Sequence, residues 1–504
     1  MNLKKSIPAH PVLLAVYPVL FLYAQNVDFT PVSEALAPMA IAGGFSLLLL
    51  LSLSFALRDR DKAGLLVSLA VAIFFSYGHF SEAMTGWASR LGEVNLSPDV
   101  MLMHLWGAFL GVGIYALVKT RRDLRALTNP LNVVTLCLVV LSLARVVSYE
   151  LRKNTWAHSG SGEEAEANLV ALGEMDTLPD IYYIILDAYA SQDMLEEIWD
   201  YDNHEFIDYL TEKGFYVVRE GRSNHTITFV SLASSLNMEY LNYLGDELGT
   251  DSKDRTRPYQ MTQNSKVMRF LKARGYKFVH FQSGWGTTAG NLYADRDIKC
   301  GNVSEFIGVL VRTTILRPLA NRFISHDRRA VVLCTFATLP EVQRVVEGPR
   351  FVFAHILVPH PPFLFGPAGE PLDTDPGFQP RDWSRYYLGQ LEFVNKKVEV
   401  LVEQLLSEAE IPPIIILQAD HGSRLGAGPP ERIHSEFHGI LNAYYLPDDG
   451  QDLLYDSITP VNTFRLIFNL YFDAGYDLLE DRMYFSRLDR PYDFLDVTDS
   501  LRGT

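Results

Sequence analysis

Five predominantly apolar stretches occupy the first third of the chain. A helix that crosses the hydrocarbon layer of a membrane needs roughly 20 apolar residues, with a range of about 17–25. The first and third stretches need flanking residues to reach that length. A signal peptide is disfavoured for the first, because no small-x-small cleavage motif precedes Asn26 and more apolar stretches follow. The pattern predicts five membrane-spanning helices, at residues 10–24, 35–57, 63–80, 99–118 and 130–149, in a domain of residues 1–153.

Basic residues are distributed unevenly between these stretches. Cytoplasmic loops carry the excess of lysine and arginine, so alternate basic loops mark the cytoplasmic side. The two opposite loops contain one basic residue, Arg90, among several acidic ones. An odd number of spans that starts inside ends outside, which predicts a cytoplasmic N-terminus and an extracytoplasmic position for everything after about residue 150. The basic residues are Lys4, Lys5, Arg58, Arg60, Lys62, Lys119, Arg121, Arg122 and Arg125.

Beyond the apolar stretches the pattern becomes that of a soluble protein. Residues 154–177 are small, polar and acidic, which is typical of a linker. From residue 178 to residue 504, runs of β-branched and aromatic residues alternate with stretches of helical spacing, which predicts an α/β domain around a mostly parallel sheet. Strands are expected at 180–186, 215–218, 277–282, 351–358 and 411–418, and helices at 191–213, 265–274, 386–406 and from about Thr228.

Polar residues follow three of the predicted strands directly. Asp187 ends the first, His360 comes just after the fourth, and Asp420 and His421 follow the fifth. Ligands of open α/β sheets bind at the carboxyl ends of the strands, so these side chains are expected to meet at one edge. Carboxylate and imidazole together suit zinc, and carboxylate-rich sites also suit manganese or magnesium.

A segment rich in hydroxyl groups, residues 223–237, can supply a nucleophile. It opens with turn-forming residues and becomes helical from about Thr228. Backbone N–H groups and the positive end of the helix dipole stabilise an alkoxide or a phosphate at such a position. Thr226, two residues earlier, is an equally competent hydroxyl on physical grounds.

Each candidate also has a purely structural explanation. Asp187 can cap the next helix, Thr228 can be a packed hydroxyl, and His360 before two prolines can belong to a rigid surface turn. A charged pair directly after an apolar strand is better explained by a ligand role, which favours the site for Asp420 and His421. A second metal site or a phosphate contact is a further hypothesis for three other histidines, which are His225, His434 and His438.

Charge and cysteine content narrow the class of protein. The formal net charge of −16 argues against a nucleic-acid partner. Three cysteines are too few for a disulfide framework. Cys137 lies in an apolar stretch, whereas Cys300 and Cys334 either pair in an oxidising compartment or remain two buried thiols.

With these motifs, the chain resembles the alkaline phosphatase/sulfatase superfamily. In layout it is similar to the membrane-anchored branch that includes lipoteichoic acid synthases and phosphoethanolamine transferases, whose five N-terminal spans precede an extracytoplasmic catalytic domain. The resemblance covers essentially the whole chain. It is carried locally by Ile184-Ile-Leu-Asp-Ala188, Thr228-Phe-Val-Ser231 and Ala419-Asp-His-Gly422.

The resemblance implies roles for individual residues. The membrane transferases usually have Glu at the position of Asp187, which blurs the subfamily. The sulfatase pattern Cys/Ser-x-Pro-x-Arg is missing around Thr228, which argues against sulfate-ester hydrolysis. The implied catalytic nucleophile is Thr228, the implied metal ligands are Asp187, Thr228, Asp420 and His421, and the implied substrate-binding residues are His360, His355, Asn224 and Ser231.

The function implied by the resemblance is that of a metal-dependent phosphotransferase in the inner (plasma) membrane of a bacterium. It would move a phospho head group from a membrane lipid to an envelope glycan or lipid through a covalent phospho-threonine. Zinc or manganese is the expected ion, with magnesium as a further candidate. Two alternatives stay open: a phosphodiesterase or phosphatase acting on an envelope phosphate ester, and a non-catalytic binding or assembly protein. The sequence leaves the oligomeric state undetermined.

Overall fold

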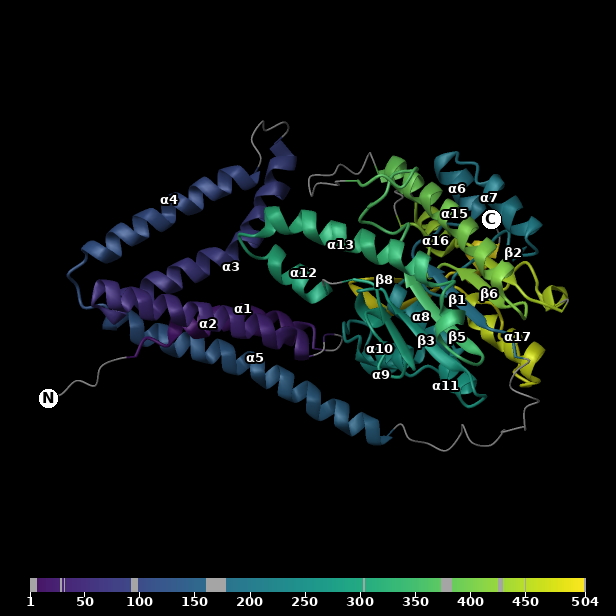
Figure 1. Ribbon diagram of the computed structural model, residues 1–504, viewed down its shortest axis with the longest axis horizontal. Coiled ribbons are helices and arrows are strands. Elements are labelled where there is room, and N and C mark those ends of the chain that lie inside the picture. The colour runs from purple at the N-terminus through teal and green to yellow at the C-terminus, as the bar shows by residue number, and fades with distance from the viewer. Residues whose placement is uncertain are drawn as a thin grey trace. The chain divides into compact units, whose positions relative to one another are not determined.

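A computed structural model describes residues 7–27, 30, 32–91, 98–159, 178–301, 304–372, 383–424, 429–448 and 450–502 (Figure 1). The chain forms two compact units. The first comprises Met1–Glu163 together with Val303–Ile324, and the second comprises Glu164–Asn302 together with Ser325–Thr504.

The second unit is built on a seven-stranded sheet of order β2-β7-β6-β1-β5-β3-β4. Strands β6, β1, β5, β3 and β4 run parallel, whereas β7 is antiparallel to β6 and to β2. A separate antiparallel pair, β8 and β9, lies near the C-terminus. The mostly parallel α/β domain is therefore confirmed. The strands are β1 Ile181–Leu186, β2 Tyr216–Val217, β3 Lys277–Gln282, β4 Arg296–Lys299, β5 Arg350–Ile356, β6 Ile414–Gln418, β7 Asn442–Tyr445, β8 Tyr484–Arg487 and β9 Arg490–Asp496.

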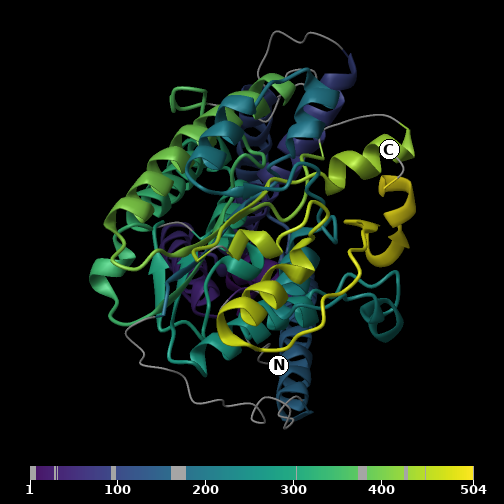
Figure 2. The same ribbon diagram turned by 90° about the vertical axis from the view of Figure 1, so that its right-hand side faces the viewer.

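Helices cover both faces of this sheet, as Figure 2 shows for α15 (green) and α17 (yellow). Alternate residues of β1 serve the two layers: Tyr182 and Ile184 pack with α15, and Tyr183 and Ile185 pack with α8 and α17. Apolar side chains on both faces explain why the strand is a continuous apolar run in the sequence. The helices are α6 Gln192–Trp199, α7 His204–Glu212, α8 Thr228–Asn237, α9 Tyr243–Leu248, α10 Thr256–Gln263, α11 Lys266–Lys272, α13 Arg317–Thr338, α14 Val342–Val345, α15 Trp383–Glu408, α16 Pro430–His438, α17 Pro460–Phe472 and α18 Thr498–Arg502, with 3-10 turns at Gly286–Thr288 and Gly450–Leu453.

The single helix predicted over 191–213 is two helices, α6 and α7. Asp200 ends α6 in the left-handed conformation, with φ 52° and its N–H donating to Glu196 O at 3.0 Å. A residue in this conformation cannot continue a right-handed helix, so the chain turns before α7 begins.

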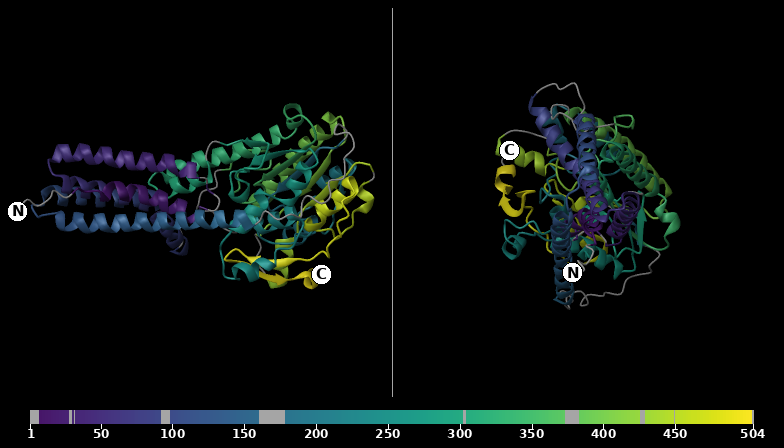
Figure 3. Two further views of the ribbon diagram at one scale, coloured as in Figure 1. Left: turned by 90° about the horizontal axis from the view of Figure 1, so that it is seen from below. Right: turned by 90° about the vertical axis from the view of Figure 1, so that its left-hand side faces the viewer.

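The first unit contains the apolar helices, which run alongside one another in Figure 3. Each of the five predicted stretches is helical. Within the residues that the structure describes, α2, α3, α4 and α5 are long and apolar enough to cross a membrane, whereas α1 has 16 residues and is shorter. Length and composition therefore support four spans, and a fifth is not established. These helices are α1 His10–Gln25, α2 Val32–Leu57, α3 Arg60–Leu91, α4 Pro98–Lys119 and α5 Arg125–Ser159.

A segment from far along the sequence also belongs to the first unit. Helix α12 (Glu305–Arg312) buries Phe306 and Leu310 against residues of α1 and α2. Beyond it, Thr313 O accepts a hydrogen bond from Gly78 N–H of α3 at 2.9 Å. The domain boundary predicted from the sequence places this segment in the catalytic domain, whereas its contacts are with the apolar helices.

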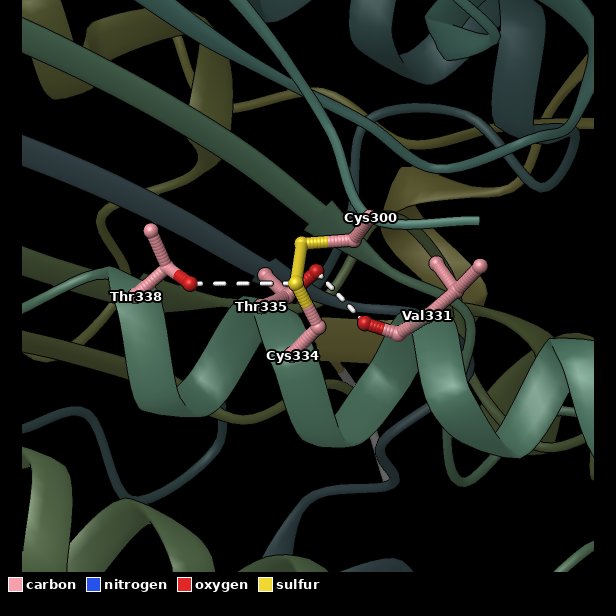
Figure 4. The surroundings of a disulfide bond; sticks show 5 residues. All are labelled: Cys300, Val331, Cys334, Thr335 and Thr338. Carbon is pink, nitrogen blue, oxygen red and sulfur yellow. Dashed lines mark hydrogen bonds between the residues drawn. A yellow bond between two sulfur atoms is a disulfide. The ribbon is translucent and has the colours of Figure 1, made fainter. Parts of the chain in front are cut away.

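Cys300 and Cys334 form a disulfide, which resolves the alternative left open by the sequence (Figure 4). Cys300 follows β4, and Cys334 lies on α13, where Thr335 hydroxyl donates to Val331 O at 2.9 Å. The disulfide joins two points of the second unit that flank the α12 segment in the sequence. Cys137 is a free cysteine.

Candidate metal centre and nucleophile

The carboxyl ends of the three central strands carry the predicted ligands. Asp187 directly follows β1, Asp420 comes two residues after β6, and His355 is the penultimate residue of β5. The register pairs Ile185 of β1 with His355 on one side and with Gln418 of β6 on the other, so the three strands end level. His360 follows β5 and donates its backbone N–H to Asp187 O at 3.0 Å, which holds this turn beside the aspartate.

The side chains of these residues converge on Asp187. Its Oδ2 lies 3.3 Å from His355 Nε2, and its Oδ1 lies 3.6 Å from His421 Nε2. Asp420 Oδ2 lies 3.3 Å from the same His421 nitrogen. Two sets of ligand atoms, Asp187 with His360 and His421 and Asp187 with His355 and Asp420, each lie within 4.8 Å of one another.

Hydrogen bonds to the chain fix which nitrogen of each histidine faces the carboxylates. His421 Nδ1 lies 2.7 Å from Gly422 O and His360 Nδ1 lies 2.5 Å from Pro361 O. A carbonyl oxygen only accepts, so Nδ1 carries the hydrogen in both rings and the Nε2 of a neutral ring keeps a lone pair. His355 Nδ1 is likewise engaged, 2.8 Å from Thr288 Oγ1.

Burial and charge set the protonation of the centre. Burial opposes ionisation of Asp187, but its electrostatic interactions with His360 and His355 outweigh burial and hold the pKa of Asp187 below its ordinary value. Burial and then the charge of Asp187 raise the pKa of Asp420. Burial and then Arg424 lower the pKa of His421 well below its ordinary value, so this ring is neutral at pH 7.

These carboxylate and imidazole groups together suit the binding of a cation. Asp187 Oδ1, Asp420 Oδ2 and His355 Nε2 are buried and have no hydrogen-bond partner among the described residues. Carboxylate oxygens and imidazole lone pairs that face one another are all acceptors, and buried acceptors without a donor are costly. A cation between them removes this cost. Mixed nitrogen and oxygen ligands suit zinc or manganese better than magnesium, which prefers oxygen alone.

Thr228 stands at this centre as the first residue of α8. Its hydroxyl Oγ1 lies 3.1 Å from His421 Nε2, and the side chain is buried. Ser231, one turn later, donates its hydroxyl to Asp420 O at 2.7 Å and so ties the helix to the loop after β6. The start of the helix therefore presents Thr228 and a positive dipole end to the cluster.

Two other predicted residues are engaged elsewhere. Thr226 Oγ1 donates to Ser486 O at 2.9 Å and accepts from Ser486 N–H at 3.2 Å. The Asn224 amide donates to Thr459 Oγ1 at 2.8 Å and accepts from Val461 N–H at 2.8 Å. These bonds fix the entry to α8 and do not bring either side chain to the metal ligands, which favours Thr228 over Thr226.

The other three histidines are not among the candidate metal groups of the described chain. His438 Nδ1 donates to Ser223 O at 2.7 Å, and His225 stacks on Tyr484 with ring centroids 5.8 Å apart. His434 lies against Phe485, with centroids 4.5 Å apart. They pack within the domain.

Arg424 is not among the residues predicted from the sequence. It follows the Asp-His-Gly motif, and its charge acts on Asp420 and His421. A cation two residues after the glycine of that motif is the signal that could have found it. The structure also gathers Glu196, Asp202 and His204, but all three are exposed, and exposed acidic groups are common without an ion.

Comparisons with known proteins give one family and several distant structures. A family model described as sulfatase matches residues 179–466. No curated protein matches the chain. The C-terminal periplasmic domain of EcEptC from Escherichia coli, in complex with Zn, is 14% identical with a TM-score of 0.43, covering 64% of this chain and 94% of that one. The integral membrane protein lipooligosaccharide phosphoethanolamine transferase A (EptA) from Neisseria meningitidis is 12% identical with a TM-score of 0.40, covering 92% and 95%.

Proposed function

Because the chain belongs to the sulfatase family, we propose that it is a membrane-anchored, metal-dependent enzyme that transfers a phospholipid-derived phospho head group to a glycan or lipid of the bacterial envelope. The observation that carries this proposal is the placement of one hydroxyl. Thr228 Oγ1 lies at a helix N-terminus, 3.1 Å from His421 Nε2 and beside two buried carboxylates. This arrangement suits a nucleophile that attacks phosphorus.

In the first step Thr228 Oγ1 attacks the phosphorus of the lipid head group. The new Oγ1–P bond forms as the bond from phosphorus to the lipid glycerol oxygen breaks, and diacylglycerol leaves with a proton. In the second step a hydroxyl of the acceptor attacks the same phosphorus. The Oγ1–P bond breaks, and the proton of the acceptor hydroxyl returns to Thr228 Oγ1. Ping-pong kinetics follow from a covalent intermediate of this kind.

The residues of the chain hold each part of this chemistry. Asp187, Asp420 and His421 would hold the cation, which when bound lowers the pKa of a nearby hydroxyl and offsets negative charge on phosphoryl oxygens. The neutral His421 ring is kept in one orientation by its Nδ1–H bond to Gly422 O. Ser231 keeps the Asp420 loop against α8 through its 2.7 Å bond. Positioning and electrostatics supply most of the catalysis of phosphoryl transfer, so this rigidity matters.

The presence of the apolar helices favours a membrane lipid as the donor of the phospho head group. The α12 segment, which follows the last apolar helix in sequence, packs at the end of α3 that the charge pattern assigns to the outer side, where Gly78 N–H donates to Thr313 O. This contact supports an extracytoplasmic catalytic domain. A head group on the outer surface of the inner membrane would then lie on the same side of the membrane as the site. The same site would act as a hydrolase if water replaced the acceptor hydroxyl.

Intact mass spectrometry of the full chain tests this function. The purified protein is loaded with zinc or manganese and incubated with vesicles of phosphatidylglycerol or phosphatidylethanolamine. We expect a lipid-dependent adduct on the wild type and on Thr226→Ala, and none on Thr228→Ala. The mass of the adduct identifies the transferred group. An adduct that persists in Thr228→Ala would refute the proposed nucleophile, and release of the head group into water without transfer to an acceptor would make the enzyme a hydrolase.

A further inference from the structure

Arg424 is held directly behind the Asp-His-Gly motif. Gly422 N–H donates to Phe437 O at 2.8 Å, and Ser423 hydroxyl donates to Glu436 Oε1 at 2.7 Å, so the turn is fastened to α16. The backbone of Arg424 then takes the left-handed conformation, with φ 56°. A bulky residue adopts this conformation only where the surrounding structure holds it, and such residues cluster at ligand sites.

The side chain of Arg424 is half-buried, and two of its guanidinium nitrogens lack hydrogen bonds among the described residues. Its Nε and Nη2 atoms are covered, and neither has a hydrogen-bond partner in the part of the chain that the structure describes. The ring of Phe437 lies beneath it, with 5.9 Å from Cζ to the ring centroid. A buried donor without an acceptor costs on the order of 1–3 kcal/mol, and more for a charged group. The planar fork of donors therefore needs an acceptor from outside the described chain.

The positive charge of Arg424 acts on two residues of the candidate metal centre, Asp420 and His421. Burial lowers the pKa of Arg424 to about 10, so the group stays cationic at neutral pH. The charges of Asp420 and Asp187 act on its pKa in the opposite direction. Arg424 comes three residues after His421, in the same turn that Gly422 fastens to α16. The carboxylates of Asp187 and Asp420 would hold the cation, and no salt bridge joins either of them to Arg424 within the described residues. An anion that enters the site would supply the acceptor that the described residues do not.

We propose that Arg424 binds the phosphoryl oxygens of the substrate beside Thr228. Arginine offers parallel N–H donors that match two oxygens of a phosphate, and these charge-assisted bonds are short and strong. The inference rests on the proposed function, because that function brings a phosphoryl group to Thr228 Oγ1. It adds a substrate-binding residue to the metal ligands and the nucleophile.

Binding of inorganic phosphate to the full chain in detergent tests this role without turnover. Titration calorimetry is carried out on metal-loaded Thr228→Ala and on the same protein carrying Arg424→Gln or Arg424→Lys. We expect Arg424→Gln to weaken phosphate binding at least about tenfold, and Arg424→Lys to weaken it less because the charge remains but the fork is lost. The control is Arg344→Gln, which removes an exposed cation that pairs with Glu341 and Glu408, and which should leave binding unchanged.

Metal analysis shows whether Arg424 binds phosphate itself or acts by holding the metal. We expect all variants to hold the same amount of metal as their parent. If Arg424→Gln lost metal in step with phosphate, or bound phosphate as tightly as its parent, the inference would be wrong. The lysine variant serves the same comparison where the glutamine variant does not fold.

Two substrates distinguish the phosphoryl group from the lipid as the ligand of Arg424. In the background with Thr228 intact, Arg424→Gln should lower kcat/KM by a similar factor for the soluble ester p-nitrophenyl phosphate and for phospholipid vesicles. A loss confined to vesicles would show that Arg424 contacts the lipid and would overturn the proposal. If phosphate binding depends on Arg424 but the wild type forms no lipid-dependent adduct on Thr228, the proposed function is refuted and this inference stands.

Discussion

Single residues around Thr228 are fixed by hydrogen bonds that leave their reactive atoms free. His421 and His360 each donate Nδ1–H to a backbone carbonyl, and Ser231 donates its hydroxyl to Asp420 O. His421 Nε2 is then left to face Thr228 Oγ1 at 3.1 Å and the carboxylates of Asp187 and Asp420. Ligand histidines held through their second nitrogen are typical of metal centres, because the outer hydrogen bond sets the orientation of the ring.

Gly422→Ala should disrupt this centre. A Cβ at this position would lie 1.8 Å from Glu436 O, which is a backbone atom and cannot swing away. We expect the loop after β6 to shift, with loss of bound metal and a decrease in the free energy of unfolding of about 1–3 kcal/mol. Metal analysis and thermal unfolding measure both. Ser423→Ala, which removes one hydrogen bond, should cost only about 1 kcal/mol, and equal effects of the two changes would contradict this explanation.

His225 should make the domain sensitive to acid. Burial and the nearby His438 lower the pKa of His225 to about 3, below its value of about 6.5 in the unfolded chain. The unfolded state therefore binds the proton more tightly, so this stability is present above pH 6.5 and is lost as the pH falls toward 3. Between pH 7 and pH 5 the loss is about 2 kcal/mol for one histidine.

His225→Phe keeps an aromatic ring among Tyr484, Tyr240 and Phe494 and removes the titration. Neither ring nitrogen of His225 has a hydrogen-bond partner among the described residues, so the change breaks no such bond there. Thermal unfolding at pH 7 and pH 5 should therefore show a smaller acid shift in the variant than in the wild type. Identical shifts would mean that other groups carry the acid sensitivity.

The ligand residues could be predicted from the sequence because they follow buried strands. Asp187 and Asp420 stand directly behind apolar runs, and parallel strands bring such positions together. The roles of Asn224 and Thr226 could not be predicted in this way. Their partners, such as Ser486 for Thr226, are more than two hundred positions away, so only the folded chain shows that these side chains are occupied.

At the scale of elements, a strand can be predicted from the sequence when both of its faces are buried. The central strands β1, β5 and β6 are buried on both faces and form continuous apolar runs, so the pattern predicts them. Strand β4, with sequence Arg-Asp-Ile-Lys, lies at the edge of the sheet and is largely exposed. Such a short polar segment has no periodic signal, and only pairing with β3 makes it a strand.

Gly78→Ala should release the α12 segment from the apolar helices. A Cβ on Gly78 would lie 2.1 Å from Arg312 O, and the shift would break the bond from Gly78 N–H to Thr313 O. We expect trypsin to cleave after Arg312 faster than in the wild type, as measured by mass spectrometry of the fragments. Gly111→Ala, on α4 with no atom within 4 Å of its Cβ, is the matched control and should leave the cleavage rate unchanged. Unchanged cleavage in Gly78→Ala would contradict the packing of this segment.

For the whole molecule, the most informative feature is the α12 segment, which belongs to the first unit although no sequence pattern predicts it. The α12 segment leaves the second unit after Cys300, joins the first unit, and returns along α13 to Cys334. The separation of 34 residues alone does not predict a disulfide. Helix α13, which continues into the core of the second unit through Val332 and Phe336, brings Cys334 to Cys300.

This disulfide gives a test of both stability and compartment. Closing a loop of this length stabilises a folded domain by about 2–4 kcal/mol, mainly by constraining the unfolded chain. Replacing both Cys300 and Cys334 with serine should therefore lower the temperature of unfolding, whereas Cys137→Ser, which changes the free cysteine, should not.

Disulfides persist in oxidising compartments and are rare in the cytosol, so the bond should be present in cells if the second unit is extracytoplasmic. In intact spheroplasts of a Cys137→Ser strain, a membrane-impermeant maleimide should label the protein only after a brief treatment with an impermeant reductant. The reductant frees Cys300 and Cys334 on the outer side, and the reagent then reaches them. Labelling that requires permeabilised membranes would place both cysteines in the cytoplasm. It would reverse the orientation inferred from the basic loops and remove the outer-surface lipid as the donor.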